Sequence, residues 1–266
     1  NLIPDEKFYS RKPDNLDSAF IGGIVQRCPQ APLILEDVRL IKTFLKLDKI
    51  FKKAYPIHQS LPKGMILWGR YQNDLYDGVH WEAGKTKGGN PWWITTLWRL
   101  QFILRFVEGT LKRGTVHIHT DSHIEFLENL GVKIDKFKAR TGGTSIKKTE
   151  PIFREVIDAL MEYIEKNFEG LLKLIPIDHR LPEQMEKATG QAQGAKSLAW
   201  SYREFIVTVM LRQELKDLYN RIFPIARPEI EKIVVGIDLG TAHVRGAIVD
   251  QEGKIMGEIL SLPTPK

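Results

Sequence analysis

The chain has 266 residues, of which 42% are hydrophobic and 27% charged, and this balance excludes an intrinsically disordered protein. There are 39 Lys and Arg against 33 Asp and Glu, and acids interrupt or flank the two basic clusters at residues 46–53 and 133–140, which argues against a nucleic-acid-binding surface. No stretch approaches the ~18 apolar residues of a membrane span, no signal peptide is visible, and the single cysteine, Cys28, excludes an internal disulfide. We expect a globular, cytoplasmic protein with no membrane or nucleic-acid partner.

Apolar residues recur every three or four positions through most of the first 225 residues, and this spacing predicts a mainly α-helical domain. One helix is expected from residue 34 to residue 51. A second begins at Pro91 and a third at Pro151, because proline fits the first turn of a helix, where its missing N–H costs nothing. The fourth is expected to bury an apolar face of Leu198, Tyr202, Phe205 and Val209.

The pattern changes after Pro224 and Pro228. Three short runs there, KIVVGIDLG, AHVRGAIVD and GKIMGEIL, are β-branched or alternate between apolar and polar residues, which predicts strands. We therefore predict two domains, residues 1–225 and residues 229–266. The first residue is Asn rather than Met, and we expect the sequence to be a segment of a longer chain.

Residues 181–202, LPEQMEKATGQAQGAKSLAWSY, hold the strongest functional signal. Glu183 lies in a polar turn, a Gly-rich spacer follows, and an aromatic-rich helix then begins near Trp200. A carboxylate can take a proton from water, and an indole can stack on a sugar ring. The alternative is that Glu183 is an ordinary acid at a helix start, where the helix dipole stabilises it.

Two further motifs lie upstream, GRYQNDLY at residues 69–76 and GNPWWITTL at residues 89–97, and LDSAFIGG at residues 16–23 precedes both. Together with LPEQ and WSY, in this order, they resemble glycoside hydrolase family 15, the glucoamylases and their relatives, over roughly residues 10–215. The loop DGVHWEAGKTKG between the two upstream motifs is longer than the family pattern. The resemblance implies the second half of an (α/α)6 toroid whose loops line one mouth.

The resemblance also implies a reaction, namely hydrolysis of terminal α-glucosidic bonds of α-glucans at non-reducing ends, with inversion, releasing glucose without a cofactor. Glu183 would be the general base. The general acid of the family lies on a Trp-Glu motif in the first half of the toroid, and Trp81-Glu82 matches that motif only superficially, in the wrong order. The substrate-binding residues implied are Arg70, Tyr71, Asp74, Trp92 and Trp200.

Alternatives remain open for this first domain. The rival interpretation is a non-catalytic glycan-binding or regulatory module, as in the α-subunits of phosphorylase kinase, which resemble the same family. Arg70 and Asp74 could form a structural salt bridge. Trp93 falls on the apolar stripe of its helix and is expected in the core, whereas Trp92 is expected to face the sugar.

Residues 229–266 resemble the first strands of an actin-like sugar kinase. The Gly240-Thr241 pair favours the glycerol and xylulose kinase type, and the SLPTP ending favours the family of repressors, open reading frames and kinases. The resemblance implies that Asp238, Gly240 and Thr241 contact nucleotide phosphate and metal, with ATP and Mg²⁺ bound only by a complete kinase domain. The alternative is a small β-meander without function.

Histidines raise one further question. His117, His119 and His123 lie close together in sequence with Asp121, but no Glu stands between them in the zinc-protease pattern and no cysteine is near, so we expect no metal site. His179, four residues before Glu183, either tunes that acid or caps the turn.

Overall fold

The computed structural model describes residues 16–26, 35–80, 84–133, 144–224, 234–239, 243–249 and 260–263. The chain divides into two compact units, residues 1–219 and residues 220–266, and each is described by itself.

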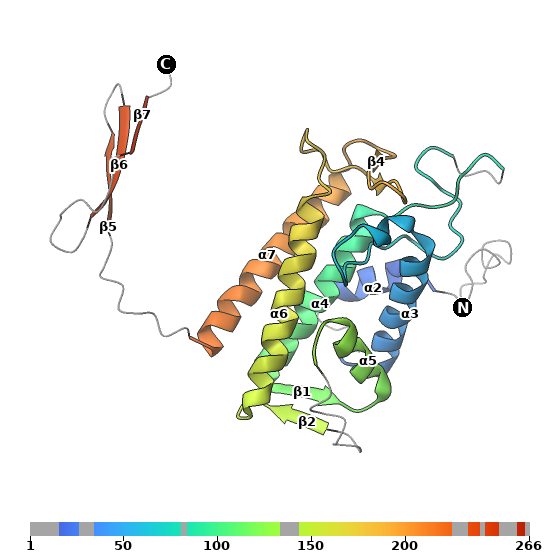
Figure 1. The fold of residues 1–266 in the computed structure, drawn as a ribbon, viewed down its shortest axis with the longest axis horizontal. Helices are drawn as coiled ribbons and strands as arrows, with labels where there is room; N and C mark the ends of the chain where they lie inside the picture. Colours follow the sequence, from blue (N-terminus) through green and yellow to red (C-terminus); the bar gives the residue numbers. More distant parts are fainter. Residues whose placement is uncertain are drawn as a thin grey trace. The chain divides into compact units, whose positions relative to one another are not determined.

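The first unit is mainly helical, as the apolar spacing predicts (Figure 1). Two short two-stranded sheets interrupt the helices, and the β1–β2 pair was not predicted. The elements in chain order are α2 (Ser18–Val25), α3 (Val38–Ala54), the 3₁₀ turn η2 (Pro56–Gln59), α4 (Trp93–Arg113), β1 (Thr115–Ile118), α5 (Asp121–Asn129), β2 (Thr144–Lys147), α6 (Pro151–Leu172), β3 (Gln184–Met185), β4 (Ala192–Gln193) and α7 (Ala199–Ile222).

The ends of these helices follow local chemistry. Asp37 caps α3 by accepting a hydrogen bond from the backbone N–H of Arg39 at 2.8 Å, and Pro151 opens α6 as predicted. Gly114 ends α4 with a φ of +68°, a conformation that glycine adopts without steric cost. Pro91 lies two residues before α4 rather than inside it, because Trp92 is the N-cap.

Helix α4 is the centre of the unit, because it buries residues on every side from Trp93 to Leu111. Phe44 of α3 stacks on Phe102 of α4 with ring centroids 4.9 Å apart, and it also contacts Trp68 at 5.2 Å and Phe126 of α5 at 5.3 Å. This aromatic cluster ties α3, α4 and α5 into one core.

Helix α7 contradicts its predicted apolar face. Phe205 packs on Phe168 of α6 with centroids 6.0 Å apart, but Val209 is 37% exposed, as are its neighbours Ile206 at 57% and Met210 at 56%. The face that α7 buries is largely polar and consists of Ser201, Glu204, Thr208, Leu211 and Leu215. The physical reason is a polar partner on α4, since one amide nitrogen there, Nε2 of Gln101, hydrogen-bonds to both Glu204 and Thr208 of α7.

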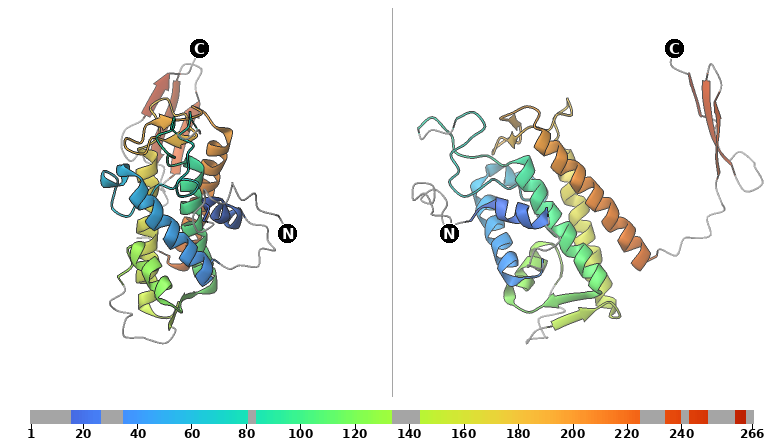
Figure 2. Two further views of the ribbon diagram at one scale, coloured as in Figure 1. Left: turned by 90° about the vertical axis from the view of Figure 1, so that its right-hand side faces the viewer. Right: turned by 180° about the vertical axis from the view of Figure 1, so that it is seen from behind.

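The two ends of the first unit differ (Figures 1 and 2). The long connection between α3 and α4 and the β3–β4 hairpin lie at one end, and the β1–β2 pair lies at the other. The functional motifs of the sequence, residues 69–76, 89–97 and 181–184, are in the loops and element starts of the first of these ends.

The second unit contains a three-stranded antiparallel sheet in the order β5 (Val234–Leu239), β6 (His243–Val249) and β7 (Leu260–Pro263). Asp238 is the penultimate residue of β5 and is in register with Arg245 of β6. Gly240 and Thr241 lie outside the described residues. In the part of the chain that is described, no helix is both long and apolar enough to cross a membrane.

Candidate functional site

Arg70 and Asp74 form the first part of the site. Nε and Nη2 of Arg70 donate to the two carboxylate oxygens of Asp74 at 2.7 and 2.6 Å, which is the bidentate geometry that suits a guanidinium. Partial burial acts to lower the pKa of Arg70, but the hydrogen bond and charge of Asp74 outweigh it and raise the pKa above its usual value. The Asp74 side chain is 3% exposed and that of Arg70 is 35% exposed, so the pair leaves the guanidinium accessible to a ligand.

Three aromatic rings surround this guanidinium. The central carbon of Arg70 lies 4.9 Å from the ring centroid of Trp92, 5.4 Å from that of Tyr71 and 5.5 Å from that of Tyr76. Tyr76 and Trp92 contact each other with centroids 5.9 Å apart. Four of the sequence-predicted residues, Arg70, Tyr71, Asp74 and Trp92, therefore lie together.

Glu183 joins the same cluster through Tyr76. The Tyr76 hydroxyl donates to Oε2 of Glu183 at 3.0 Å, and the Ala195 N–H donates to the same oxygen at 3.3 Å. Burial, and then the bond to Glu183, raise the pKa of Tyr76 above its ordinary value, so the phenol keeps its proton and remains the donor. Among the described residues, the other carboxylate oxygen of Glu183 has no hydrogen-bond partner, and it can accept a proton from water.

Glu183 does not lie at the start of α7, as the alternative of an ordinary helix-start acid would require. Glu183 directly precedes β3, and α7 begins only at Ala199. The Glu183 carbonyl accepts from the Trp93 N–H at 3.3 Å, and Trp92 forms an isolated bridge with Gln184. Glu183 is thus tied to the start of α4 rather than to the dipole of α7.

The long loop after Tyr76 is fixed by Asp77, which is 7% exposed. Burial acts to raise the pKa of Asp77, but hydrogen bonds from the backbone N–H groups of His80, Val79 and Lys87 outweigh it and hold the pKa well below its usual value. The loop that is longer than the family pattern is therefore held in place by hydrogen bonds between its own residues.

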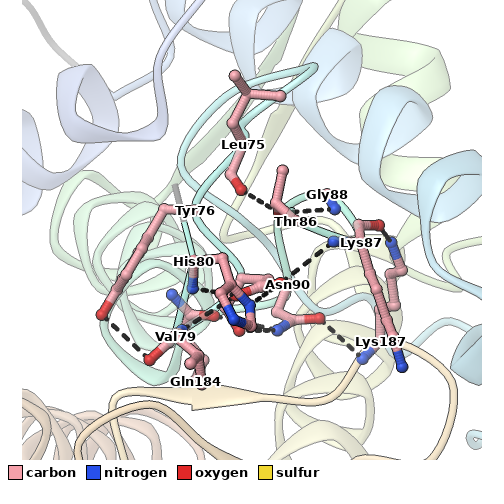
Figure 3. Close-up of polar contacts among 12 residues, drawn as sticks. Leu75, Tyr76, Val79, His80, Thr86, Lys87, Gly88, Asn90, Gln184 and Lys187 are labelled. Atoms are coloured by element: carbon pink, nitrogen blue, oxygen red, sulfur yellow. Dashed lines mark hydrogen bonds and ion pairs between the residues drawn. The ribbon is translucent and has the colours of Figure 1, made fainter. Parts of the chain in front are cut away.

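Asn90 joins this loop to the segment that follows Glu183 (Figure 3). Its amide nitrogen donates to the Asp77 carbonyl at 2.8 Å and to the Gln184 side chain at 3.1 Å, and its oxygen accepts from the Lys187 N–H at 3.2 Å. One buried amide therefore joins the GNPWW and LPEQ motifs to Asp77, the residue directly after GRYQNDLY. A cavity of about 730 Å³ lies along α3 and is also lined by Gln72 and Asn73, but Arg70, Trp92 and Glu183 do not line it. The contacts rather than cavity size therefore identify the site.

Trp200 lies apart from this cluster in its described contacts. Its ring packs edge-on against Trp98 with centroids 5.7 Å apart, its Nε1 donates to Glu204 at 3.2 Å, and it is 49% exposed. The structure thus brings Trp92, but not Trp200, into contact with Arg70. Trp81 and Glu82 lie outside the described residues.

The histidines form no metal site within the described residues. His123 is buried with both ring nitrogens engaged, Nδ1 by Thr120 at 2.8 Å and Nε2 by the Glu36 carbonyl at 2.9 Å. His179 has a φ of +58° and donates its N–H to the Pro176 carbonyl at 2.8 Å, so its backbone forms a turn before Glu183.

Three residues of the cluster were missed from the sequence, namely Tyr76, Asn90 and Gln184. All three lie inside the motifs GRYQNDLY, GNPWW and LPEQ, so the signal was present. Their roles depend on contacts between distant motifs, as in the Tyr76–Glu183 bond between residues 107 positions apart.

Residues 9–210 match the family of Glycosyl hydrolases family 15. Among curated relatives, the chain is 27% identical over 158 residues to "Glucoamylase" of Blastobotrys adeninivorans, covering 59% of this chain and 24% of that protein. It is 25% identical over 212 residues to "Glucoamylase GLU1" of Saccharomycopsis fibuligera, covering 76% of this chain and 40% of that protein.

Solved structures share the fold. A glucoamylase from Saccharomycopsis fibuligera aligns with a TM-score of 0.70 at 22% identity, over 81% of this chain and 44% of that chain. A glucoamylase from Hormoconis resinae aligns with a TM-score of 0.63 at 23% identity, over 81% of this chain and 34% of that chain. The chain therefore spans between about a quarter and two fifths of the two curated relatives, and less than half of these two structures.

Proposed function

The chain belongs to glycosyl hydrolase family 15, and from this premise we propose that its site takes part in the hydrolysis of terminal α-glucosidic bonds of α-glucans, releasing glucose with inversion. The observation that carries the proposal is the position of Glu183, held by Tyr76 beside the Arg70–Trp92 pair, with one carboxylate oxygen left to accept a proton. Hydrolysis with inversion needs such a base to activate a water. Arg70 would donate to sugar hydroxyls while Trp92, Tyr71 and Tyr76 supply aromatic surface.

A second carboxyl group, about 6.5–9.5 Å from the first, must protonate the departing oxygen. Within the described residues, the two acids nearest in sequence to Tyr76 are already engaged, Asp74 by Arg70 and Asp77 by backbone N–H groups that hold its pKa low. We propose that the acid comes from the remainder of a complete toroid. The 266-residue chain alone should then hydrolyse α-glucans very slowly, because one general acid is worth about 10² to 10⁴ in rate.

The exposed surface of α7 supports the proposal that the described helices form only part of a toroid. Its exposed side chains Ile206, Val209 and Met210 form an apolar strip, and Trp200 on the same helix is 49% exposed. Exposed apolar strips of this kind mark surfaces that other protein segments cover. We propose that the rest of the toroid packs on this strip, whereas Trp200 lies on the other side of α7, against Trp98 of α4.

A non-catalytic glycan-binding module is the second candidate, because Arg70 and its aromatic neighbours could hold a sugar without a general acid. One experiment separates the two. Maltotetraose is incubated with a protein that contains these 266 residues together with their flanking coding sequence, and the anomer released is followed by proton NMR. The enzyme should release β-glucose, and Glu183→Gln should lower kcat by at least about 10² with little change in KM. Glu186→Gln is the matched control, because Glu186 caps its own turn at Ala188 and Thr189.

Binding of maltotetraose without any turnover would favour the module. Near-normal turnover of Glu183→Gln would show that Glu183 is not the base.

For residues 229–266 we propose that the three strands begin an actin-like sugar kinase domain. The support is the β5–β6 hairpin, in which Asp238 is the penultimate residue of β5 and stands two positions before Gly240 on the chain. The described strands alone do not form a nucleotide site, so titration of the 266-residue chain with MgATP should show no binding, and a longer chain should bind. Failure of the longer chain to bind MgATP would leave a β-meander without that function.

A further inference from the structure

A buried segment, Met65–Arg70, carries Arg70 to the site, and its polar groups are held by the surrounding elements rather than by its own regular structure. The Leu67 N–H donates to Nε2 of His58 at 2.8 Å, and the Trp68 N–H donates to Oγ1 of Thr96 at 3.0 Å. The Trp68 carbonyl accepts from the Trp92 N–H at 2.8 Å. Trp68 therefore fixes the start of α4, where Trp92 stands.

The indole of Trp68 is fixed by a buried ion pair. Its Nε1 donates to Oδ1 of Asp48 on α3 at 2.7 Å, and Nε and Nη2 of Arg99 on α4 donate to the two Asp48 oxygens at 2.7 and 3.0 Å. Arg99 also donates to the Tyr163 hydroxyl at 2.7 Å, which in turn donates to the Gly64 carbonyl at 2.6 Å, directly before the segment. The side chains of Arg99 and Asp48 are 2% and 5% exposed.

Stability by itself does not explain why a buried ion pair occupies this position. Removing two charges from water is costly, and apolar side chains of similar volume often replace a buried pair without loss of stability. Hydrogen bonds between charged groups are directional, however, and they specify one position of the indole. The segment has little freedom beside it, because a Cβ on Gly69 would lie 1.9 Å from the Tyr55 hydroxyl oxygen.

We propose that the Asp48–Arg99 pair is a positioning device that acts through Trp68 to set the register of Arg70 and Trp92. The guanidinium of Arg70 lies 4.9 Å from the centroid of the Trp92 ring. Trp68 influences the positions of both residues, because it precedes Arg70 by two positions on the chain and its carbonyl accepts a hydrogen bond from the Trp92 N–H. A small displacement of Trp68 would change the spacing between these two groups. The inference rests on the proposed function, in which they hold the sugar.

The test uses the double variant Asp48→Leu/Arg99→Met, which removes the pair but retains apolar volume. The matched control is Glu165→Gln/Arg212→Gln, which removes the partly exposed pair between α6 and α7. The guanidinium chloride unfolding midpoint and the hydrogen-exchange rate of the Trp92 amide by NMR are measured on the 266-residue chain. The affinity for acarbose is measured by calorimetry on the longer protein that also contains the flanking coding sequence. If the Asp48–Arg99 pair were purely structural, its removal would change the unfolding midpoint but neither the acarbose affinity nor the Trp92 exchange rate relative to the control.

We expect Asp48→Leu/Arg99→Met to stay folded, to bind acarbose at least tenfold more weakly and to exchange the Trp92 amide at least tenfold faster, while the control keeps both values within twofold. If the double variant does not fold, Trp68→Phe, which lacks the indole donor, should show the same two changes. Unchanged exchange and affinity in the folded variant would overturn the proposal. Absence of acarbose binding in the wild type would refute the proposed function, and the Trp92 exchange rate would still decide the positioning role.

Discussion

The contact between Gly194 and Glu183 allows a quantitative prediction. Gly194 has a φ of +73°, and a Cβ added there would lie 2.5 Å from Oε2 and 3.2 Å from Cβ of Glu183. The Gly194→Ala substitution therefore has two costs, a strained backbone and a displaced carboxylate. Gly131 provides the matched control, because its φ is +85° and its Cβ would meet nothing within 4 Å.

The two costs can be separated. Gly131→Ala should lower the free energy of unfolding by about 1 kcal/mol, which is the backbone term alone. Gly194→Ala should cost about 2 to 3 kcal/mol, because the displaced carboxylate also loses the hydrogen bond from Tyr76, worth about 1 to 2 kcal/mol at a partly exposed charged group. Guanidinium chloride unfolding followed by tryptophan fluorescence measures both values.

A double-mutant cycle with Tyr76→Phe completes the test. In that background the hydrogen bond is already gone, so Gly194→Ala should cost only about as much as Gly131→Ala, about 1 kcal/mol. Equal costs for the two glycine substitutions in the wild-type background would refute the reasoning, because they would show that the carboxylate moves aside without loss of its bond.

Three further predictions concern the fold around the site. Burial lowers the pKa of His58 below its ordinary value of 6.5, and its Nε2 must stay unprotonated to accept the Leu67 N–H, so its contribution to stability is complete above about pH 6.5 and is lost as the pH falls through the folded pKa. His58→Gln should flatten the dependence of unfolding free energy on pH below about 6.5 in guanidinium chloride unfolding, and an unchanged slope would contradict this. Asp77 has a lowered pKa, so its contribution is present in full above the ordinary value of 3.8 and is lost progressively as the pH falls toward the folded pKa. Asp77→Asn should cost about 2 kcal/mol at pH 7 by urea unfolding and less at pH 2, and an equal cost at both values would contradict this. Phe44→Ala, at the centre of the aromatic core, should cost about 3 to 5 kcal/mol in the same assay, and a cost below about 1.5 kcal/mol would mean that the core closes around the gap.

The sequence by itself predicted helices α3, α4, α6 and α7, with some ends displaced by a few residues. Apolar spacing depends only on which side chains share one face of a helix, and caps such as Asp37 and breaks such as Gly114 act within a few residues. The Arg70–Asp74 pair also belongs to this class, because its partners are four positions apart. Local rules therefore predicted the mainly helical fold and part of the candidate site.

Only the tertiary structure decided which face of α7 is buried, where Trp200 lies, and how Glu183 is held. A helix buries the face that its neighbours can satisfy, and Gln101 on α4 selects Glu204 and Thr208 over the apolar strip at Val209. Asp48 and Arg99 are 51 positions apart, and Tyr76 and Glu183 are 107 apart. No local pattern encodes such pairs, because a buried hydrogen bond is stabilising only when packing of the whole core brings both groups out of water together.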